Sequence, residues 1–325
     1  MNVLVTGGAG YIGSHLVDRL MDIGYGVIVV DNLSVGSLEN LGRWLKNSRF
    51  RFVKGELKEP MDAERVIREN IDIVFHFAAN PEVRVGETNP KVHFDENLCV
   101  TCNLLEAMRT SNSAKTIVFA STSTVYGEAA IFPTPEDYGP LIPISTYGAS
   151  KLGCEALISA YAYTFGLRGL ILRFANVVGP RATVGVVLDF IEKLRNNPNQ
   201  LVILGDGLQK KSYLYIDDCV DTVFCALNAF LDGNNRVDVY NVGSLDQVDV
   251  NRIAEIVVEE MNLKDVEFVY SSRGEGGRGW RGDVKFMHLS SEKLRKHGWK
   301  PKYKSEEAIR IAARILSKFE LLNCK

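Results

Sequence analysis

The chain has 325 residues, which predicts roughly two domains of about 150 residues each. Its 38 Lys and Arg against 40 Asp and Glu leave a formal net charge of −2, and 46% of its residues are hydrophobic. This balance excludes a general electrostatic attraction to nucleic acids or anionic membranes, and it excludes disorder as the main state. The sequence shows neither an apolar run of the about 18–20 residues that a membrane span needs nor a signal peptide. We therefore expect a cytoplasmic protein that binds neither membranes nor nucleic acids.

Short apolar runs predict strands at residues 3–6, 27–30, 51–53, 71–77, 116–120 and 169–174. Amphipathic segments lie between most of them. The first has Ile12, Leu16 and Leu20 at four-residue spacing and a plausible end at Gly24. Fully apolar strands that alternate with helices predict an α/β fold with a Rossmann-type doubly wound parallel sheet.

The alternation becomes irregular after residue 176, although residues 237–242 read as one more strand of the same sheet. Residues 309–319 predict a terminal helix. We predict a nucleotide-binding domain over residues 1–176 with the late strand near 237–243. A smaller α/β C-terminal substrate domain would comprise 177–236 and 244–325.

Three glycines mark the first junction between a strand and a helix. Gly7, Gly10 and Gly13 form G-x-x-G-x-x-G, which lets the backbone approach a pyrophosphate at a helix N-terminus. Asp31 ends the second strand at about the distance expected for a ribose-binding carboxylate. Such a carboxylate repels a 2′-phosphate, so the pattern favours NAD over NADP. The alternative is an ordinary tight turn with an exposed aspartate.

Tyr147 and Lys151 are spaced i and i+4 on a predicted helix, and Thr122 follows the strand at 116–120. These three residues are candidates for acid–base chemistry at the carboxyl end of the sheet. A tyrosine that acts as a base near pH 7 needs its pKa lowered by about three units, or roughly 4 kcal/mol. One cation supplies about one to three units, so we expect Lys151 to act together with the cationic ring of oxidised NAD. The alternative is an amphipathic surface pair.

Two further patterns carry less information. Cys99 and Cys102 have the C-x-x-C spacing of half a zinc site or a redox dithiol, but also of two small residues on adjacent helical turns. The sequence lacks a second Cys or His pair at ligand spacing, so we expect no metal. The loop at 273–283 is rich in Arg and Gly, which superficially suggests RNA binding. Its acidic residues and the acidic chain favour a loop that wraps a diphosphate.

The motifs together resemble the UDP-glucose 4-epimerase family, in the nucleotide-sugar branch of the extended short-chain dehydrogenases/reductases. The matching segments cover nearly the whole chain and comprise residues 5–15, 30–34, 76–79, 121–127, 147–151, 172–176, 204–207 and 240–243. The resemblance implies that Tyr147, helped by Thr122, takes the proton of the sugar 4-hydroxyl while C4 gives hydride to tightly bound NAD. The keto sugar then turns over and is reduced on its other face, which interconverts UDP-glucose and UDP-galactose.

The resemblance also implies two sets of binding residues. Those for the cofactor are Gly7, Gly10, Tyr11, Ile12, Gly13, Asp31, Asn32, Glu56, Leu57, Phe77, Ala78, Ala79, Asn97, Tyr147 and Lys151. Those for the UDP-sugar are Thr122, Asn176, Lys211, Arg278 and Asp283.

Several positions depart from the family pattern. Glu56 stands where Asp is usual, and Lys211 replaces an Arg that would make a bidentate phosphate contact. Arg281 competes with Arg278 for the diphosphate, and spacing does not decide between them. Residues 80–84 differ from the bacterial enzymes, so no role is transferred to them.

The sequence leaves several functions open. Ser123 and Thr124 stand where dehydratases carry Asp-Glu and decarboxylases a Glu, which favours epimerisation. The alternatives are a 4-epimerase of UDP-N-acetylhexosamine or UDP-glucuronate, and, ranked after these, a UDP-glucuronate decarboxylase. A non-catalytic NAD sensor would typically have lost Tyr147 or Lys151. The resemblance further implies a homodimer that packs helices at about 91–110 and 147–165 into a four-helix bundle.

Overall fold

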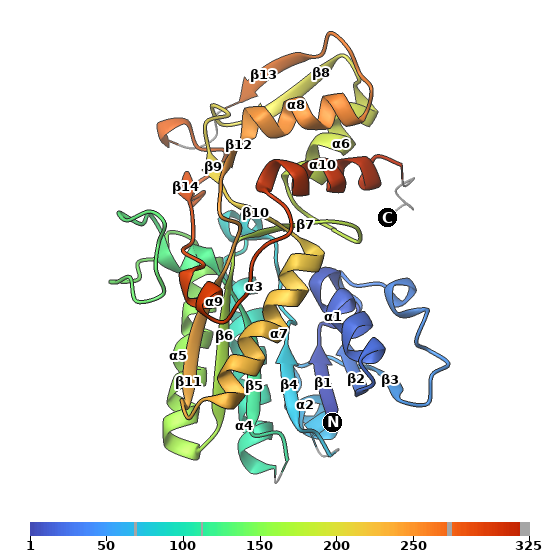
Figure 1. Cartoon of the computed structure of the whole chain (residues 1–325), viewed down its shortest axis with the longest axis vertical. Coiled ribbons are helices and arrows are strands. Elements are labelled where there is room, and N and C mark those ends of the chain that lie inside the picture. Colours follow the sequence, from blue (N-terminus) through green and yellow to red (C-terminus); the bar gives the residue numbers. More distant parts are fainter. Residues whose placement is uncertain (68–69, 112, 272–274, 319–325) are drawn as a thin grey trace.

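The computed structural model describes residues 1–67, 70–111, 113–271 and 275–318. At its centre lies a seven-stranded parallel sheet with the strand order β11-β6-β5-β4-β1-β2-β3 (Figure 1). The strands are β1 (Asn2–Thr6), β2 (Gly26–Asp31), β3 (Phe50–Lys54), β4 (Ile73–His76), β5 (Thr116–Thr122), β6 (Arg168–Phe174) and β11 (Val237–Val242). The predicted doubly wound sheet is confirmed, and the late strand at 237–242 joins it as expected, where it pairs with β6.

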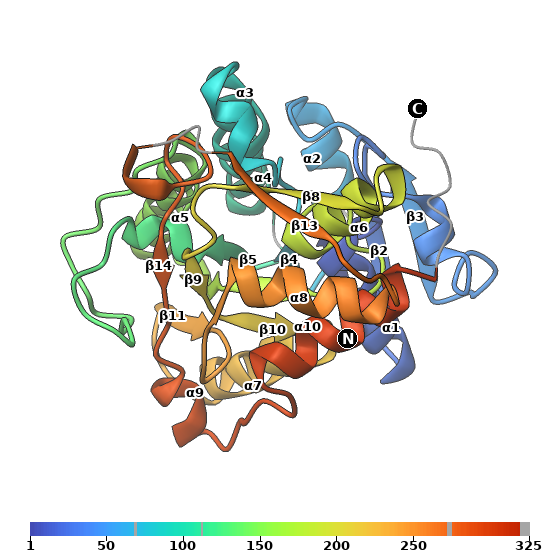
Figure 2. The same ribbon diagram turned by 90° about the horizontal axis from the view of Figure 1, so that it is seen from above.

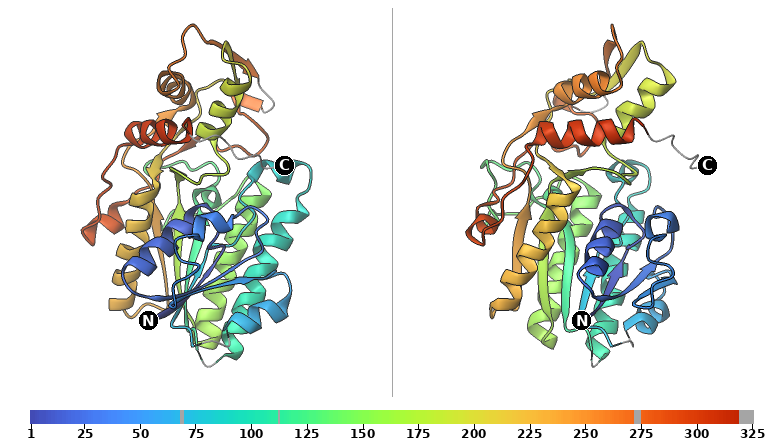
Figure 3. Two further views of the ribbon diagram at one scale, coloured as in Figure 1. Left: turned by 90° about the vertical axis from the view of Figure 1, so that its right-hand side faces the viewer. Right: turned by 45° about the vertical axis from the view of Figure 1, so that its right-hand side comes forward.

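Helices cover both faces of this sheet. On one face α1 (Tyr11–Asp22) packs against α7 (Ile216–Asp232). On the other lie α2 (Pro60–Ile67), α4 (Val100–Thr110) and α5 (Thr146–Phe165), which pack side by side (Figures 1 and 3). Each face has its own apolar core, with Val3 and Val5 of β1 turned to one side and Leu4 to the other. This period of two is what a strand buried on both sides produces.

The segment between β4 and β5 is not one regular helix. A short turn η2 (Val83–Glu87) precedes α3 (Lys91–His93), and a π-helical stretch η3 (Phe94–Cys99) leads into α4. The first part of the helix expected at 91–110 is therefore wider than an α-helix. Such π-helical insertions are frequent at functional sites because they re-aim the side chains around them.

A smaller lobe lies over the carboxyl ends of the large sheet, as Figure 2 shows from above. Its strands are β7 (Asn176–Val178), β8 (Gln200–Leu204), β9 (Lys210–Lys211), β10 (Tyr213–Tyr215), β12 (Val248–Asp249), β13 (Glu267–Ser271) and β14 (Phe286–Met287). Its helices are α6 (Val186–Asn196), α8 (Val250–Glu260) and α10 (Ser305–Leu316), and α9 (Glu292–Lys296) packs beside β11. The predicted terminal helix at 309–319 thus starts earlier, at Ser305, and its predicted end at Phe319 lies outside the described residues.

One helix does not follow the predicted domain boundaries. Helix α7 lies within 177–236, which the sequence assigns to the substrate domain, yet it packs against α1, β6 and β11 of the large sheet. After residue 176 the chain therefore returns to the large sheet and its helices twice, once with α7 and once with β11. The division into two domains stays a prediction.

None of the helices in the described residues is long and apolar enough to cross a membrane.

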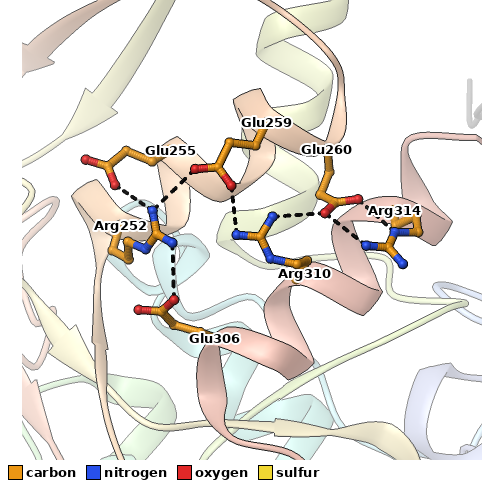
Figure 4. A network of polar contacts seen from close by, with 7 residues as sticks. All are labelled: Arg252, Glu255, Glu259, Glu260, Glu306, Arg310 and Arg314. Atoms are coloured by element: carbon orange, nitrogen blue, oxygen red, sulfur yellow. Dashed lines mark hydrogen bonds and ion pairs between the residues drawn. The ribbon is translucent and has the colours of Figure 1, made fainter.

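Helices α8 and α10 of the small lobe are joined by a chain of ion pairs (Figure 4). Arg310 lies between two carboxylates, at 2.7 Å from Glu259 and 3.0 Å from Glu260. The network also contains Arg252, Glu255, Glu306 and Arg314. Because the side chains of Arg252 and Arg310 are partly exposed, each of their ion pairs contributes only about 0.2–1 kcal/mol, but shared charges add up along the network.

We predict that Arg310→Met lowers the free energy of unfolding by about 1 kcal/mol, because it removes two of these pairs at once. Urea denaturation measures the change. The difference from the unmodified chain should shrink in about 1 M NaCl, where exposed charges are screened. Arg314→Met, which removes contacts to Glu260 alone, is the matched control and should cost less. An effect of Arg310→Met that does not depend on salt would show that packing, not charge, holds the two helices together.

Candidate active site

A cavity of about 530 Å³ lies between the carboxyl ends of the large sheet and the small lobe. Nearly all the residues predicted for the site line it, although they come from segments far apart in the sequence. Those present in the lining are Gly7, Gly10, Tyr11, Ile12, Gly13, Asp31, Asn32, Glu56, Leu57, Phe77, Ala78, Ala79, Thr122, Tyr147, Lys151, Asn176, Lys211 and Asp283. The fold thus brings most of the residues predicted to bind the cofactor and most of those predicted to bind the substrate to a single cavity.

The glycine turn between β1 and α1 leaves no room for side chains. Gly7 has φ +67°, and a Cβ on it would lie 2.6 Å from the backbone nitrogen of Ala78. A Cβ on Gly13 would lie 2.2 Å from the carbonyl oxygen of Gly7. The turn therefore packs directly against the segment that follows β4, and Gly7, Gly10 and the start of α1 line the cavity. This is the geometry of a dinucleotide pyrophosphate site.

Asp31 lies at the end of β2, where its carboxylate is held by two backbone donors. Oδ2 accepts from Ala9 N at 3.0 Å and Oδ1 from Leu33 N at 2.8 Å. Burial nevertheless raises the pKa of this carboxyl. Each oxygen keeps a further lone pair for a ligand hydroxyl. The carboxylate is thus fixed in place beside the glycine turn, as ribose recognition requires.

Tyr147 and Lys151 lie one turn apart on α5, and burial disfavours the charged form of both. It raises the pKa of Tyr147 to about 12, against a hydrogen bond with Thr122 that acts in the opposite direction. It lowers the pKa of Lys151 to about 8. Lys151 Nζ donates to the carbonyl oxygen of Ala120 at 2.8 Å and lies 6.0 Å from the centre of the Tyr147 ring. The ammonium is therefore fixed against the sheet near the tyrosine ring.

Hydroxyl groups line the cavity next to this tyrosine. Thr122, the last residue of β5, has its Oγ1 at 3.1 Å from Thr124 Oγ1, and Ser123 lies between them in the lining. Thr122 also begins the turn η4 (Ser123–Tyr126), because its hydroxyl accepts from Thr124 N at 3.2 Å. The strand end thus presents neutral donors and acceptors to the cavity, without a carboxylate at these three positions.

The small lobe contributes a charged pair to the other side of the cavity. Lys211 Nζ lies 2.7 Å from Asp283 Oδ1, and Asp283 is only 2% exposed. The same ammonium lies 5.6 Å from the centre of the Trp280 ring. Asn176 faces the cavity from β7, with its amide nitrogen 3.4 Å from the carbonyl oxygen of Ser212. These groups are suited to the polar part of a nucleotide.

Two predicted site residues do not line the cavity. Asn97 is buried behind it, where its Oδ1 accepts from Asn80 N at 2.8 Å and its amide donates to Ser150 Oγ at 3.0 Å. Arg278 forms an ion pair with Glu128 at 2.8 Å, and its Nε donates to the carbonyl oxygen of Asp283 at 3.1 Å. Arg281, its competitor for the diphosphate, is likewise absent from the lining, and its backbone nitrogen donates to Glu87. Residues Arg273 and Gly274 of this loop lie outside the described residues.

Other residues in the lining were not identified from the sequence. Glu82 and Arg84, in the segment to which no role was transferred, form a bidentate ion pair with contacts of 3.0 and 3.1 Å. Asp189 of α6, Gln209 and Trp280 also face the cavity. The sequence could have identified Gln209, because it precedes Lys211 by two positions. In an extended segment, residues two positions apart lie on the same side.

Buried polar atoms without a partner show that the cavity is built for a polar ligand. Within the described residues the only such side-chain atoms are Tyr11 Oη, Gln209 Oε1, Trp280 Nε1 and Trp299 Nε1. The first three belong to residues in the lining. Gln209 is 3% exposed, and its amide nitrogen already donates to Leu204 O at 3.0 Å, so its oxygen must be the free acceptor. Because an unpaired buried polar atom costs about 1–3 kcal/mol, these atoms favour a bound partner.

Comparison with known proteins supports this view of the site. Residues 3–243 match the model of the NAD dependent epimerase/dehydratase family. The chain belongs to this family. Members of it use NAD, and the glycine turn, Asp31 and the unpaired Tyr11 hydroxyl fit that cofactor.

Individual relatives align over almost the whole chain. A putative UDP-glucose 4-epimerase of Methanocaldococcus jannaschii is 33% identical over 312 residues, which are 95% of this chain and 96% of the relative. A crystal structure of a UDP-galactose 4-epimerase has 45% identity and a TM-score of 0.87, covering 98% of this chain and 99% of the other. The UDP-glucose 4-epimerase of Thermus thermophilus, solved with NAD, has 33% identity and a TM-score of 0.84 with the same coverage. Other solved neighbours are named as 4-epimerases of UDP-N-acetylglucosamine and UDP-glucuronic acid.

Clusters of three or more His, Cys, Asp or Glu side chains that could hold a metal ion do not occur in the described part of the chain. Cys99 and Cys102 are free thiols.

We predict that Gly7→Ala abolishes retention of the dinucleotide, because the new Cβ collides with the backbone at Ala78. Gly166→Ala is the matched control. Gly166 also has a positive φ, +74°, but a Cβ built on it has no neighbour within 4 Å. Gly166→Ala should therefore cost only about 1–2 kcal/mol, the energy of placing an alanine in the left-handed conformation. The dinucleotide released by acid from each purified protein is measured alongside its melting temperature. Equal retention by the two variants would contradict the role of the turn.

Proposed function

We propose that the protein interconverts UDP-glucose and UDP-galactose by reversible oxidation at C4 of the hexose, with NAD held throughout. The observation that carries this proposal is the row of hydroxyls at Thr122, Ser123 and Thr124 beside Tyr147. Removal of water from the sugar needs an additional acid and base next to the catalytic hydroxyl. A wall of neutral hydroxyls supports proton transfer at one carbinol and a simple return of the hydride.

The charges of the lining support a neutral hexose. Its described cations are Arg84, Lys151 and Lys211. Arg84 is neutralised by Glu82 and Lys211 by Asp283, while Lys151 is held against the sheet at Ala120. The described acidic residues of the lining are more numerous, namely Asp31, Glu56, Glu82, Glu96, Asp189 and Asp283. The carboxylate of a uronic acid would add a further negative charge where the cations already have partners.

In this proposal Tyr147 accepts the proton of the 4-hydroxyl and later returns it. Thr122 is hydrogen-bonded with the phenol, favours its ionised form and lies within reach of the same carbinol. Lys151, fixed at Ala120, supplies positive charge from one turn further along α5. Bound NAD supplies the hydride acceptor for C4 and the donor for the return step. The partial burial of Tyr147 limits the contact of the phenol with water, which favours proton transfer between the sugar and the protein.

The nucleotide must be held firmly while the hexose turns. In this proposal Lys211, Asp283 and Asn176 of the small lobe bind the nucleotide side, and the Gln209 oxygen and the Trp280 N–H, which lack partners in the structure, supply one acceptor and one donor there. The hydroxyls of Thr122, Ser123 and Thr124 offer the hexose fewer charged contacts than the small lobe offers the nucleotide. This asymmetry supports rotation of the keto sugar about a fixed nucleotide.

A homodimer and a cytoplasmic location remain part of this proposal. The helices expected to form the dimer present large exposed apolar side chains, with Tyr163 at 66%, Phe94 at 51% and Phe165 at 48% exposure. Burial of such side chains between two copies would be favourable.

The test is incubation of the purified holoenzyme with UDP-glucose, UDP-N-acetylglucosamine and UDP-glucuronate separately, followed by chromatography of the products. We expect rapid conversion of UDP-glucose to UDP-galactose. The 4-epimerases of the other two sugars are the competing functions, and a decarboxylase would yield a UDP-pentose. Exclusive turnover of UDP-N-acetylglucosamine or UDP-glucuronate would overturn the proposal.

We predict that Tyr147→Phe lowers kcat by at least about a hundredfold, since general acid–base catalysis contributes 10²–10⁴-fold. The variant should retain its dinucleotide, because the phenol oxygen takes part in proton transfer while the glycine turn provides binding. Activity with the preferred sugar and acid-released dinucleotide are measured on the same preparation. Unchanged turnover would remove Tyr147 from the mechanism.

A further inference from the structure

We propose that His93 is a positioning residue for the reaction, which fixes the catalytic tyrosine against the cavity wall formed by residues 82–84. This inference rests on the proposed role of Tyr147. His93 was not singled out by the sequence, and it does not line the cavity. It lies at the end of α3, just before the π-helical stretch η3, and is fully buried.

The hydrogen bonds of the imidazole define its state. His93 Nε2 lies 3.1 Å from the backbone carbonyl oxygen of Glu82, and a carbonyl can only accept, so Nε2 carries the hydrogen. His93 Nδ1 lies 2.9 Å from Thr146 Oγ1. Burial lowers the pKa of His93, which favours the neutral ring, so Nδ1 is the acceptor and the Thr146 hydroxyl the donor. One side chain thus joins two segments that are otherwise distant in the sequence.

One partner of His93 lines the candidate active site, and the other directly precedes a lining residue. Glu82 lines the cavity and holds Arg84 in its bidentate pair. Thr146 is the first residue of α5 and directly precedes Tyr147. The imidazole therefore connects the wall that faces the ligand with the start of the helix that carries the base.

The ring of His93 also contacts the catalytic residue itself. The centroids of the His93 and Tyr147 rings are 5.6 Å apart at an interplanar angle of 68°, an edge-to-face arrangement. Edge-to-face pairs contribute about 0.5–1.5 kcal/mol beyond their buried area. With the imidazole plane set by its two hydrogen bonds, this contact restricts the orientation of the phenol.

The packing around this contact admits little movement. A Cβ on Gly86 would lie 2.3 Å from Thr146 Oγ1 and 3.1 Å from His93 Cε1. The turn η2 is thus pressed directly onto the hydrogen-bonded pair. A phenol that must abstract a proton from a hexose presenting either face benefits from such a rigid support, because small displacements of a catalytic group are costly.

The test compares His93→Phe, which keeps an aromatic ring but removes both hydrogen bonds, with His93→Gln, which retains a donor and an acceptor. Thr146→Val removes one hydrogen bond from an exposed position and guards against a folding defect of the buried variant. Each holoenzyme is assayed with the preferred UDP-hexose for kcat and KM, with acid-released dinucleotide and melting temperature as controls. The double variant His93→Phe/Thr146→Val completes a double-mutant cycle.

We expect His93→Phe to lower kcat roughly 10- to 100-fold, the cost of a slightly misplaced catalytic group, with KM and dinucleotide content little changed. Thr146→Val should lower kcat in the same sense, less than additively with His93→Phe, and His93→Gln should recover most of the rate. Unchanged kcat in His93→Phe and Thr146→Val, or a loss that follows only melting temperature and dinucleotide content, would overturn the inference. Absence of UDP-hexose turnover in the unmodified holoenzyme would instead overturn the proposed function.

Discussion

The candidate site depends on one constraint, which is the free energy needed to hold a charged side chain in a buried environment. Tyr147 is half-buried in the cavity lining and Lys151 is 2% exposed, and burial shifts their pKa values to about 12 and about 8, respectively. The shifts disfavour the phenolate of Tyr147 and the ammonium of Lys151, the forms that the proposed mechanism needs. The hydrogen bond with Thr122 acts against the shift of Tyr147 only in part, and one nearby cation typically lowers a pKa by only about one to three units. The chain alone therefore leaves the base largely protonated near neutral pH, and cationic charge in the cavity is required to activate it.

The surrounding structure explains how Lys151 keeps its place despite this cost. One turn further along α5, Glu155 forms a buried ion pair with Arg173 of β6 at 2.7 Å and accepts a 2.5 Å hydrogen bond from Ser121. Glu155 also acts to raise the pKa of Lys151. Arg173 in turn donates to Tyr126 Oη at 2.8 Å, and Tyr126 is the last residue of the turn η4 that carries Ser123 and Thr124. A single buried network thus fixes α5, β5 and β6 relative to one another, and removal of one partner from such a pair typically costs about 3–5 kcal/mol.

Much of this could be predicted from the sequence, and for identifiable reasons. The central sheet strands are mainly apolar runs bounded by turn residues, and the glycine turn and Asp31 have fixed spacings that reflect a local geometry. The strand at 237–242 was recognised by the same apolar pattern although it arrives late in the chain. Such signals are local, so they survive without knowledge of the tertiary structure.

The site features that the sequence did not predict depend on the directions in which side chains point. The spacing of residues along the sequence does not reveal those directions. Arg278 lies in the expected loop, but its guanidinium points to Glu128, and Asn97 lies on the expected helix, but its amide joins Asn80 to Ser150. The π-helical stretch η3 alters the phase of the helix just where Asn97 lies. Glu82 and Arg84 face the cavity through a turn whose sequence differed from the pattern, and the contacts of His93 link segments 11 and 53 residues away. Long-range contacts of this kind appear only in the folded chain.

The central claim is that the proton leaves from oxygen and the hydrogen at carbon travels as hydride, within one closed site. It is tested most directly by conversion of UDP-glucose labelled with deuterium at C4, carried out in ordinary water and followed by mass spectrometry. The account predicts UDP-galactose that keeps the whole label at C4. Replacement of the label by solvent hydrogen would show that the C4 hydrogen is removed as a proton, and would contradict the account.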